Sequence, residues 1–468
     1  MENNIIFKTF HTFKYPYLYD RHTNSLVIIN EAEYEELQRV EQKLLPPEKS
    51  FVVAQYQKQG LLTPNVVKVI RHPKMDIVEQ YLNTRLKQLT LQVTQNCNLR
   101  CNYCAYSGLY SGNRKHGCQH MSWEVAKSAI DFFMARNHSL PEVTIGFYGG
   151  EALLEYDLIK KCVQYADSLV EGQTIRYNLT TNGTLLNDEI VDYLVKNRFI
   201  LAVSLDGPQS EHDKNRRFAN GKGSFGIIIN NMKRIMNRYP EYYKTITIMT
   251  TVTPMMDLQC ALDFFTVEDV FADQYIMFNP MLETNIKQEI PYEEAFAQIK
   301  TFEYIKALFS IVGKIPKENV SKLTRNTRIR IDRLARAIEN HGELVAVVHP
   351  GGPCIPGVHR LFIAVDGTFY PCEKVPEQLD YFKIGSLKEG FHLDKIRQIM
   401  NVGCVTEQEC KDCWNLDNCS ICASTIEFTD QPDWKAKKPV CHKSKMENAY
   451  ALYEYCVLKE FGYQYQET

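Results

Sequence analysis

From residue 89 onward, short apolar runs alternate with longer segments whose apolar residues lie three and four positions apart. The short runs predict buried strands, and the longer segments predict amphipathic helices. Strands that alternate with helices at this spacing predict an α/β fold, a parallel sheet covered by helices and curved into a partial (β/α)6 barrel over residues 88–290. The six predicted strands begin at Leu89, Glu142, Ile175, Ile200, Ile246 and Gln274.

The segments on either side of this pattern are different in character. Residues 1–80 contain a possible hairpin that turns at Asp20 to Asn24, followed by a charged amphipathic helix in EAEYEELQRVEQKLL. This pattern predicts a small α+β unit, which a polar stretch from Arg71 to Lys87 separates from the sheet. Residues 291–350 predict a helical bridge. Residues 351–468 predict a loop-rich, cysteine-rich domain that a C-terminal amphipathic helix closes.

Composition narrows the class of protein. The chain has 468 residues, of which 44% are hydrophobic and 24% charged, as in ordinary globular proteins. A formal net charge of −2 favours neither nucleic acid nor anionic membrane as a partner. The N-terminus, MENNIIFKTF, lacks a secretory signal profile, and no apolar run approaches the roughly 18 residues of a membrane span. We therefore expect a cytoplasmic protein.

Fifteen cysteines are distributed unevenly along the chain. Three lie within residues 97–104 and eight within residues 354–441, a clustering that predicts metal or redox centres in a reducing compartment. Of the scattered cysteines, Cys162, Cys260 and Cys456 are expected in the core, because free cysteine packs as a small hydrophobe. Cys118 is assigned no role.

The first cluster reads CNLRCNYC and follows the first predicted strand, at the end of a parallel sheet where ligands bind. Two chemistries suit three thiolates. Zinc would need a fourth ligand, for which His116, Cys118 or His120 are candidates. A [4Fe–4S] cluster would keep one iron without a protein ligand.

Small and polar residues follow the next three strands at the same rim. They are GGE at Gly149 to Glu151, TTNG from Thr180 and SLDG from Ser204, and HDKNRRFANGKGSF continues from His212. Successive glycines let a ligand approach the backbone, and a carboxylate accepts from an ammonium group. This rim suits a zwitterionic amino acid that is joined to a nucleoside.

Together these motifs resemble those of the radical S-adenosylmethionine (SAM) enzymes. In that family the iron without a protein ligand binds the amino and carboxylate groups of S-adenosyl-L-methionine. The resemblance implies three cluster ligands, Cys97, Cys101 and Cys104. It implies cofactor contacts from Tyr103 beside the adenine, from Gly149, Gly150 and Glu151 at the ammonium, and from Ser204, Asp206 and Arg216 toward the sugar and carboxylate. One departure is Ala152, where the family often has a proline that stiffens the turn.

The second cysteine field resembles the SPASM extension of radical enzymes that act on peptides. The resemblance implies two auxiliary [4Fe–4S] clusters, and hence three clusters in the chain. The outer cluster would be held by Cys410, Cys413, Cys419 and Cys441. The inner one would be held by Cys354, Cys372 and Cys422, with either Cys404 or an open iron at its fourth position. Paired zinc ribbons are the alternative.

The N-terminal unit resembles the winged-helix-like element by which peptide maturases recognise a leader. Such an element accepts the leader as an added strand, so that backbone hydrogen bonds grip many sequences while pockets select among them. The implied partners are a ribosomal precursor peptide with a leader, and an external one-electron reductant of the flavodoxin or ferredoxin type. A plain decoration of the barrel is the alternative.

The resemblance implies a 5′-deoxyadenosyl radical that installs intramolecular thioether crosslinks, from a cysteine sulfur to a carbon of an acceptor residue. Alternatives are carbon–carbon or carbon–oxygen crosslinking, epimerisation, and sulfatase maturation to formylglycine. Asn279 and Pro280 count against the last, because an acidic base is expected there. A non-catalytic iron–sulfur electron carrier or redox sensor is the alternative outside enzymes. No further catalytic side chain is assigned.

Overall fold

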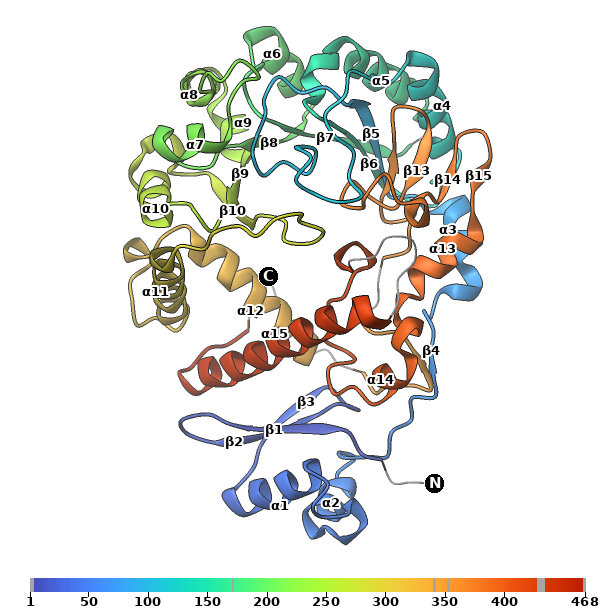
Figure 1. Ribbon diagram of the computed structural model, residues 1–468, viewed down its shortest axis with the longest axis vertical. Helices are drawn as coiled ribbons and strands as arrows, with labels where there is room; N and C mark the ends of the chain where they lie inside the picture. The colour runs from blue at the N-terminus through green and yellow to red at the C-terminus, as the bar shows by residue number, and fades with distance from the viewer. Residues whose placement is uncertain (1–3, 171, 340–341, 352–353, 427–433, 466–468) are drawn as a thin grey trace.

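The computed structural model describes residues 4–465 apart from 171, 340–341, 352–353 and 427–433. A large sheet with its helices occupies one end of the molecule, and the N-terminal unit occupies the other (Figure 1). The C-terminal helix α15, Trp434–Glu460, crosses the space between them. In the described part of the chain, no helix is long and apolar enough to cross a membrane.

The predicted parallel sheet is confirmed. Its strands run in the order β10-β9-β8-β7-β6-β5, and every neighbouring pair is parallel. β5 is buried along almost its whole length, whereas β8 and β9 alternate between buried and more exposed residues. The strands are β5 (Gln88–Thr94), β6 (Glu142–Gly149), β7 (Thr174–Thr181), β8 (Ile200–Ser204), β9 (Thr247–Val252) and β10 (Tyr275–Pro280).

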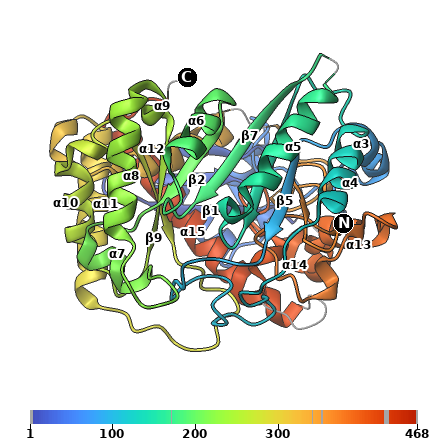
Figure 2. The ribbon, with the colours of Figure 1, turned by 90° about the horizontal axis from the view of Figure 1, so that it is seen from above.

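Helices cover the outer face of this sheet (Figure 2). Their buried stripes join the strands in one hydrophobic core, in which Phe133 of α4, Ile159 of α5 and Met232 of α8 are fully buried. These helices are α4 (Trp123–Met134), α5 (Tyr156–Ser168), α6 (Asp188–Lys196), α7 (Gln209–Asn215), α8 (Phe225–Arg238), α9 (Pro240–Thr245) and α10 (Leu258–Val267).

The C-terminal segment extends the sheet, which the sequence did not predict. Strand β12 pairs in parallel with β5, and β13, β14 and β15 follow as antiparallel neighbours. The result is a mixed ten-stranded sheet, so the cysteine-rich segment is built onto one edge of the barrel. The added strands are β12 (Leu361–Ile363), β13 (Thr368–Tyr370), β14 (Gly385–Ser386) and β15 (Gly390–Phe391).

The N-terminal unit contains the predicted hairpin and helix, together with one strand that the sequence did not indicate. The hairpin pairs β2 (Pro16–Asp20) with β3 (Ser25–Ile28), and β1 (Phe7–His11) pairs with β2. Helices α1 (Glu31–Glu41) and α2 (Phe51–Gln57) cover one face of this sheet. The opposite face packs on α12 and α15, because Tyr19, Ile331 and Leu452 share a buried cluster.

The polar stretch expected between the first unit and the sheet is ordered. It contains α3 (Val78–Thr84), and β4 (Val69–Ile70), which lies directly before this stretch, pairs with β11 (Val347–Val348) of the C-terminal half. Val78 and Leu82 of α3 are buried in the core of the large sheet. Packing on the sheet therefore begins before Lys87.

Helices α11 (Glu294–Ile311) and α12 (Leu323–Glu339) form the expected bridge. Arg330 of α12 forms an ion pair with Glu454 of α15 at 2.5 Å. Two short helices, α13 (Leu393–Met400) and α14 (Glu407–Lys411), complete the C-terminal part. Of the scattered cysteines, Cys162 and Cys456 are buried as expected, whereas Cys260 is only half-buried and Cys118 is exposed.

Candidate active site

The loop after β5 brings Cys97, Cys101 and Cys104 to one pocket of about 300 Å³, which we call the cysteine pocket. Backbone N–H groups of Leu99 and Tyr106 donate to the sulfurs of Cys97 and Cys104, each at 3.4 Å. Burial raises the pKa of Cys97 to about 11 and that of Cys101 to about 12. A metal that binds these thiols therefore has to displace their protons.

The paired glycines have a different use from the expected one. A Cβ on Gly149 would lie 2.1 Å from the carbonyl oxygen of Thr94, and a Cβ on Gly150 would lie 2.1 Å from that of Asn96. These glycines let the cysteine loop pack directly on the end of β6. Both still line the cysteine pocket, so a ligand in it would also meet their backbone.

Glu151 lines the same pocket and is almost fully buried, at 2% exposure. Burial raises its pKa, although it accepts hydrogen bonds from the Asn182 backbone N–H and the Thr181 hydroxyl, both at 2.8 Å, and from the Leu153 backbone N–H at 3.2 Å. A carboxylate has about four acceptor sites, so capacity for one more donor remains. The end of β7 therefore holds Glu151 in a fixed orientation at the pocket wall.

Asp206 lies behind the pocket wall and not at its surface. Its side chain is fully buried and accepts from Arg216 Nε at 2.8 Å, from the Tyr103 hydroxyl and from the Thr251 N–H at 3.0 Å. Burial lowers the pKa of Arg216, but the charge of Asp206 outweighs this and leaves that pKa well above its usual value. Tyr103, Ser204 and Arg216 do line the pocket. Asp206 therefore holds Tyr103 and Arg216 in position, and its own contact with a cofactor stays a prediction.

His212 fixes the turn that carries this ion pair. Its Nδ1 accepts from the Asp206 N–H at 3.3 Å, and its Nε2 lies 2.9 Å from the Ser224 hydroxyl, which donates to Arg216 O. Burial lowers the pKa of His212 to about 4. The ring is therefore neutral at physiological pH, and the HDKNR and GSF motifs serve to hold Arg216.

The candidate zinc ligands separate in space. His116 lines the cysteine pocket, and neither of its buried ring nitrogens has a hydrogen-bond partner among the described residues. His120 is exposed and lies 3.7 Å from Glu155, and Cys118 is also exposed. Across the described residues, no three His, Cys, Asp or Glu side chains form a group placed to hold a metal ion. Three thiols around one cavity, one buried and two half-buried, are a donor set that fits an iron–sulfur cluster, which takes one thiolate per iron.

The four cysteines expected at the outer site come together. Cys410, Cys413, Cys419 and Cys441 line one cavity of about 330 Å³, which we call the outer cavity. Lys437 also lines it, one helical turn before Cys441, and is 1% exposed. Its ammonium group donates to the Thr406 hydroxyl at 2.6 Å and lies 3.9 Å from the Cys410 sulfur.

The cysteines expected at the inner site are Cys354, Cys372 and Cys422, and their charges are near enough to affect one another. Burial raises the pKa of Cys372 most, and the charges of Glu373, Cys422 and Cys354 raise it further. Cys404 instead donates to Ile70 O at 2.9 Å, and its charged neighbours are Glu407, Lys437 and Cys410. Cys404 therefore lies beside the outer cavity, so the expectation that it could complete the inner set is not supported.

Three residues near these sites carried no signal in the sequence. Arg114 lies 3.6 Å above the Tyr106 ring and pairs with Glu377 at 3.2 Å, tying the cysteine loop to the C-terminal part. His349 accepts from the Gly403 N–H at 2.8 Å beside the outer cavity, and burial lowers its pKa to about 4. Lys437 could have been noticed only by its four-residue spacing from Cys441.

Comparison with known proteins identifies the class. Residues 91–263 match the model of the Radical SAM superfamily, and the fold and the cysteine pocket agree with that match. Residues 91–263 therefore form a Radical SAM domain, for which S-adenosylmethionine and a [4Fe–4S] cluster are the implied cofactors.

The chain is homologous to anaerobic sulfatase-maturating enzymes. It is 26% identical to the cysteine-type enzyme of Clostridium novyi over 361 residues, which cover 75% of this chain and 90% of that one. It is 31% identical to the serine-type enzyme of Bacteroides thetaiotaomicron over 197 residues, or 41% of this chain and 45% of that one. Among solved structures, anSMEcpe with bound AdoMet and a Cp18Cys peptide superposes with a TM-score of 0.58 at 20% identity, covering 80% and 99% of the two chains.

Proposed function

We propose that this radical SAM enzyme modifies a ribosomally made precursor peptide by joining a cysteine sulfur to a carbon of an acceptor residue. The observation that carries the proposal is the inner set, Cys354, Cys372 and Cys422. These thiols affect one another electrostatically, while Cys404 lies at the outer cavity. Three cysteines leave one position of a four-iron cluster for a substrate thiolate.

In this proposal the two cysteine-rich segments have different roles. When bound, S-adenosylmethionine and its cluster supply a hydrogen-abstracting carbon radical, and iron–sulfur groups in the second field supply an electron acceptor. Glu151 and the backbone at Gly150 would orient the methionyl end of the cofactor. Arg216, held by Asp206, would bind its carboxylate. Each thioether removes two hydrogens from the peptide, one as an atom from carbon and one as a proton from sulfur.

The absence of an uncommitted carboxylate supports this chemistry over formylglycine formation. Among the described residues that line the cysteine pocket, Glu151 is the carboxylate, and both its oxygens already accept hydrogen bonds. At the end of β10 stands Asn279, whose amide donates to Met277 O at 3.3 Å. Coordination to a metal lowers the pKa of a substrate thiol, so that thiol loses its proton without a strong protein base. A substrate that is not bound to a metal needs such a base.

The decisive assay uses a short cysteine-containing peptide, which is to be sought among the reading frames beside this gene. The enzyme is reconstituted anaerobically and incubated with S-adenosylmethionine, a reductant and the peptide. Thioether formation predicts release of 5′-deoxyadenosine, loss of two hydrogens per ring, and cysteines that no longer react with iodoacetamide. A peptide of unchanged mass that incorporates solvent deuterium would refute the proposal in favour of epimerisation.

Sulfatase maturation is the second candidate, because the curated relatives named above carry that activity. The same reaction mixture, supplied with a sulfatase-derived cysteine peptide, tests it directly. Formylglycine is an aldehyde and reacts with a hydrazide reagent, whereas a thioether does not. If the product peptide is labelled by the hydrazide, formylglycine formation is the assigned reaction and thioether formation is refuted.

We further propose that the N-terminal unit binds the leader at strand β3. The outer edge of β1 is engaged, because Glu41 accepts from the Thr9 N–H at 3.0 Å. Among the described residues, strand β3 pairs with β2 alone, and the Ile29 N–H donates to Pro16 O at 3.1 Å. Antiparallel pairing alternates, so the Ile28 N–H points away from β2 and is available to an added strand.

A proline at position 28 tests this edge. Ile28 is 55% exposed, so Ile28→Pro removes the outward N–H while Ile28→Ala keeps it as the matched control. We expect the proline variant to bind the leader peptide about tenfold more weakly in fluorescence anisotropy, and the alanine variant to bind nearly as the parent does. Equal affinities for all three proteins would exclude strand addition at β3.

A further inference from the structure

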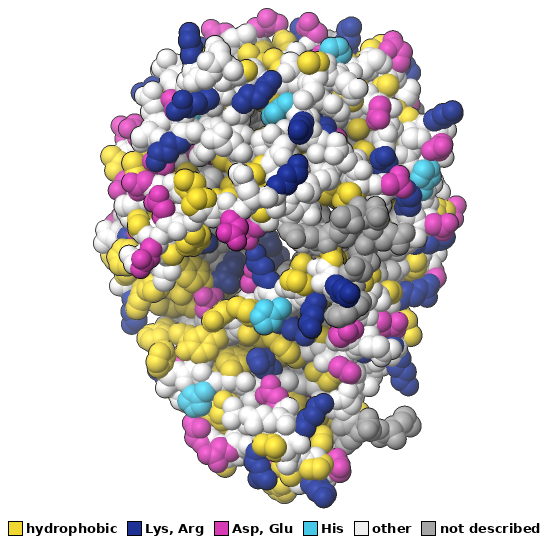
Figure 3. All heavy atoms as spheres, in the orientation of Figure 1, with side chains coloured by type: hydrophobic (Ala, Val, Ile, Leu, Met, Phe, Trp, Pro, Cys, Tyr) yellow, Lys and Arg dark blue, Asp and Glu magenta, His cyan; other side chains and the backbone are white. Residues whose placement is uncertain are grey.

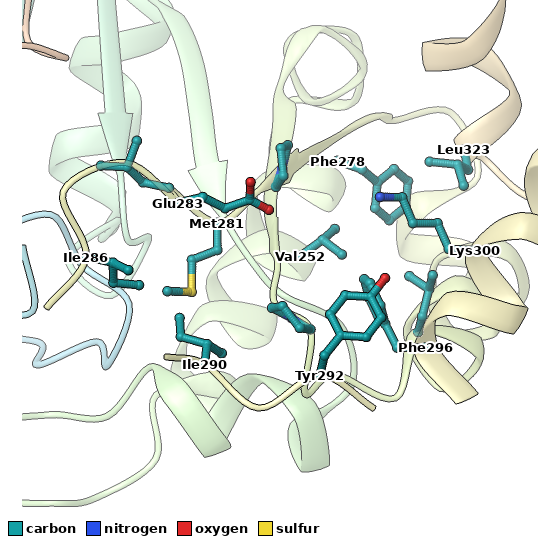
Figure 4. A pocket seen from close by; sticks show the side chains of 14 residues that line it. Val252, Phe278, Met281, Glu283, Ile286, Ile290, Tyr292, Phe296, Lys300 and Leu323 are labelled. Atoms are coloured by element: carbon teal, nitrogen blue, oxygen red, sulfur yellow. The ribbon is translucent and has the colours of Figure 1, made fainter. Parts of the chain in front are cut away.

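A second cavity adjoins the cysteine pocket and has no part in the chemistry described above. It has a volume of about 400 Å³ and lies between the ends of β9 and β10, helix α11 and the segment 281–292, which we call the strap. Figure 4 shows the side chains of Val252, Phe278 and Met281 directed into it. We call it the apolar cavity.

Its walls are mostly apolar, and Glu283 and Lys300 are the charged side chains among the described residues that line it. Leu258 and Phe296 are 2% and 5% exposed, and they belong to a hydrophobic cluster that Val252 and Phe278 contact. The Tyr292 ring meets that of Phe296 edge-on, with centroids 5.7 Å apart. A volume of this size lies in the range of ligand pockets, which are typically about 300–1,000 Å³.

The strap is held over the cysteine loop by backbone contacts. Tyr110 and Ile286 form an antiparallel bridge, and Ser111 N–H donates to Asn285 O at 2.8 Å. The buried Tyr110 hydroxyl lies 3.1 Å from Tyr103 O and 3.2 Å from Leu282 O. The strap is therefore fixed relative to the thiols, and so is the cavity beneath it.

Shared walls place the apolar cavity between two other spaces. Pro280, Met281 and Leu282 line both it and the cysteine pocket. Tyr292 and Lys300 line both it and a larger space of about 1110 Å³ between α11, α12 and α15, which we call the central cavity. Figure 3 shows the molecule hollowed near the middle of this face, with Lys and Arg side chains inside.

We propose that the apolar cavity binds one large aliphatic or aromatic side chain of the substrate polypeptide, near the residue that reacts. The proposal rests on the proposed peptide substrate. A polypeptide that reaches the cysteine pocket from the central cavity passes along the wall that the apolar cavity shares with both. Burial of a large apolar side chain there selects sequences, because apolar pockets discriminate by about 10- to 200-fold per small change in size.

The test compares blocked pentapeptides, acetyl-Gly-Gly-Xaa-Gly-Gly-amide, with Leu, Phe, Ala or Gln at the central position. Binding to anaerobic holoenzyme with S-adenosylmethionine and no reductant is followed by saturation-transfer NMR. We expect the Leu and Phe peptides to bind at least about tenfold more tightly than the Ala and Gln peptides. Equal affinities would overturn the proposal. Because no turnover is involved, 5′-deoxyadenosine release tests the proposed function separately.

A bulky substitution that fills the apolar cavity tests whether the preference for the Leu and Phe peptides arises there. Ile290 lines the apolar cavity and neither neighbouring space, so Ile290→Trp should abolish the preference. Ile227→Trp is the matched control, because Ile227 is 45% exposed on α8. Leu323→Trp fills the cavity from α12 if the strap variant fails to retain its iron. A preference that survives filling, or that the control also loses, would overturn the assignment.

Discussion

The buried ion pair between Asp206 and Arg216 yields the sharpest quantitative prediction. Asp206 is fully inaccessible and accepts from Arg216 Nε at 2.8 Å, and Arg216 keeps its charge because its pKa is far above neutrality. Asp206→Asn preserves the shape but leaves a buried guanidinium without its counter-charge. Breaking a buried pair in this way costs about 3–5 kcal/mol, a large part of a typical folding free energy of about 5–15 kcal/mol.

The assay is pulse proteolysis in urea on anaerobically reconstituted protein. We expect Asp206→Asn to lose about 3–5 kcal/mol, and Arg216→Met in the same chain to restore at least half, because the uncompensated charge is then gone. Asp192→Asn is the control, since Asp192 pairs with Arg238 at 2.7 Å on the exposed face of α6 and should cost about 1 kcal/mol or less. A loss below about 1 kcal/mol for Asp206→Asn, or additive losses in the double variant, would refute the reasoning.

Three further predictions concern Gly150, Lys437 and His349. Gly150→Ala should displace the cysteine loop and remove about four irons per chain by chemical analysis, whereas Gly226→Ala, which has open space around it, should keep them. Lys437→Met should lower the reduction potential of the outer site by an amount on the order of 100 mV in an EPR redox titration, because a buried positive charge favours the reduced state. His349 has a pKa lowered to about 4, so the stability that its neutral form contributes is complete above pH 6.5 and falls by about 3 kcal/mol as the pH drops to 4. Urea midpoints at pH 7.5 and 5 should therefore diverge less in His349→Gln than in the parent.

The parallel sheet could be predicted because its strands are short apolar runs separated by amphipathic helices of ordinary length. The positions of Glu151 and Arg216 followed from that topology, since the carboxyl ends of parallel strands share one rim. The role of Asp206 could not be predicted in this way. An aspartate at the end of a strand can contact a cofactor or support an arginine, and the sequence does not distinguish these two roles, because the packing around the side chain decides between them.

The pairing of β12 with β5 lay outside the reach of sequence reasoning. β12 has three residues, too few to show a period, and it sits in a segment dominated by loops. Pairing between residues 89–91 and 361–363 is set by tertiary contacts across the whole chain. The same holds for α3, whose sequence VEQYLNT reads as polar although Val78 and Leu82 are buried in the main core.

The two edge strands of the parallel sheet, β5 and β10, have different neighbours, and this difference bears on the size of the substrate. At the β5 edge, β12 continues the sheet. At the β10 edge no further strand is paired among the described residues, and the strap and the apolar cavity lie there instead. The sheet is thus extended on one side by the C-terminal segment and bordered on the other by cavities. Under the proposed function, a peptide substrate would lie across this rim, with its reactive residue over the thiols and a neighbouring side chain in the apolar cavity.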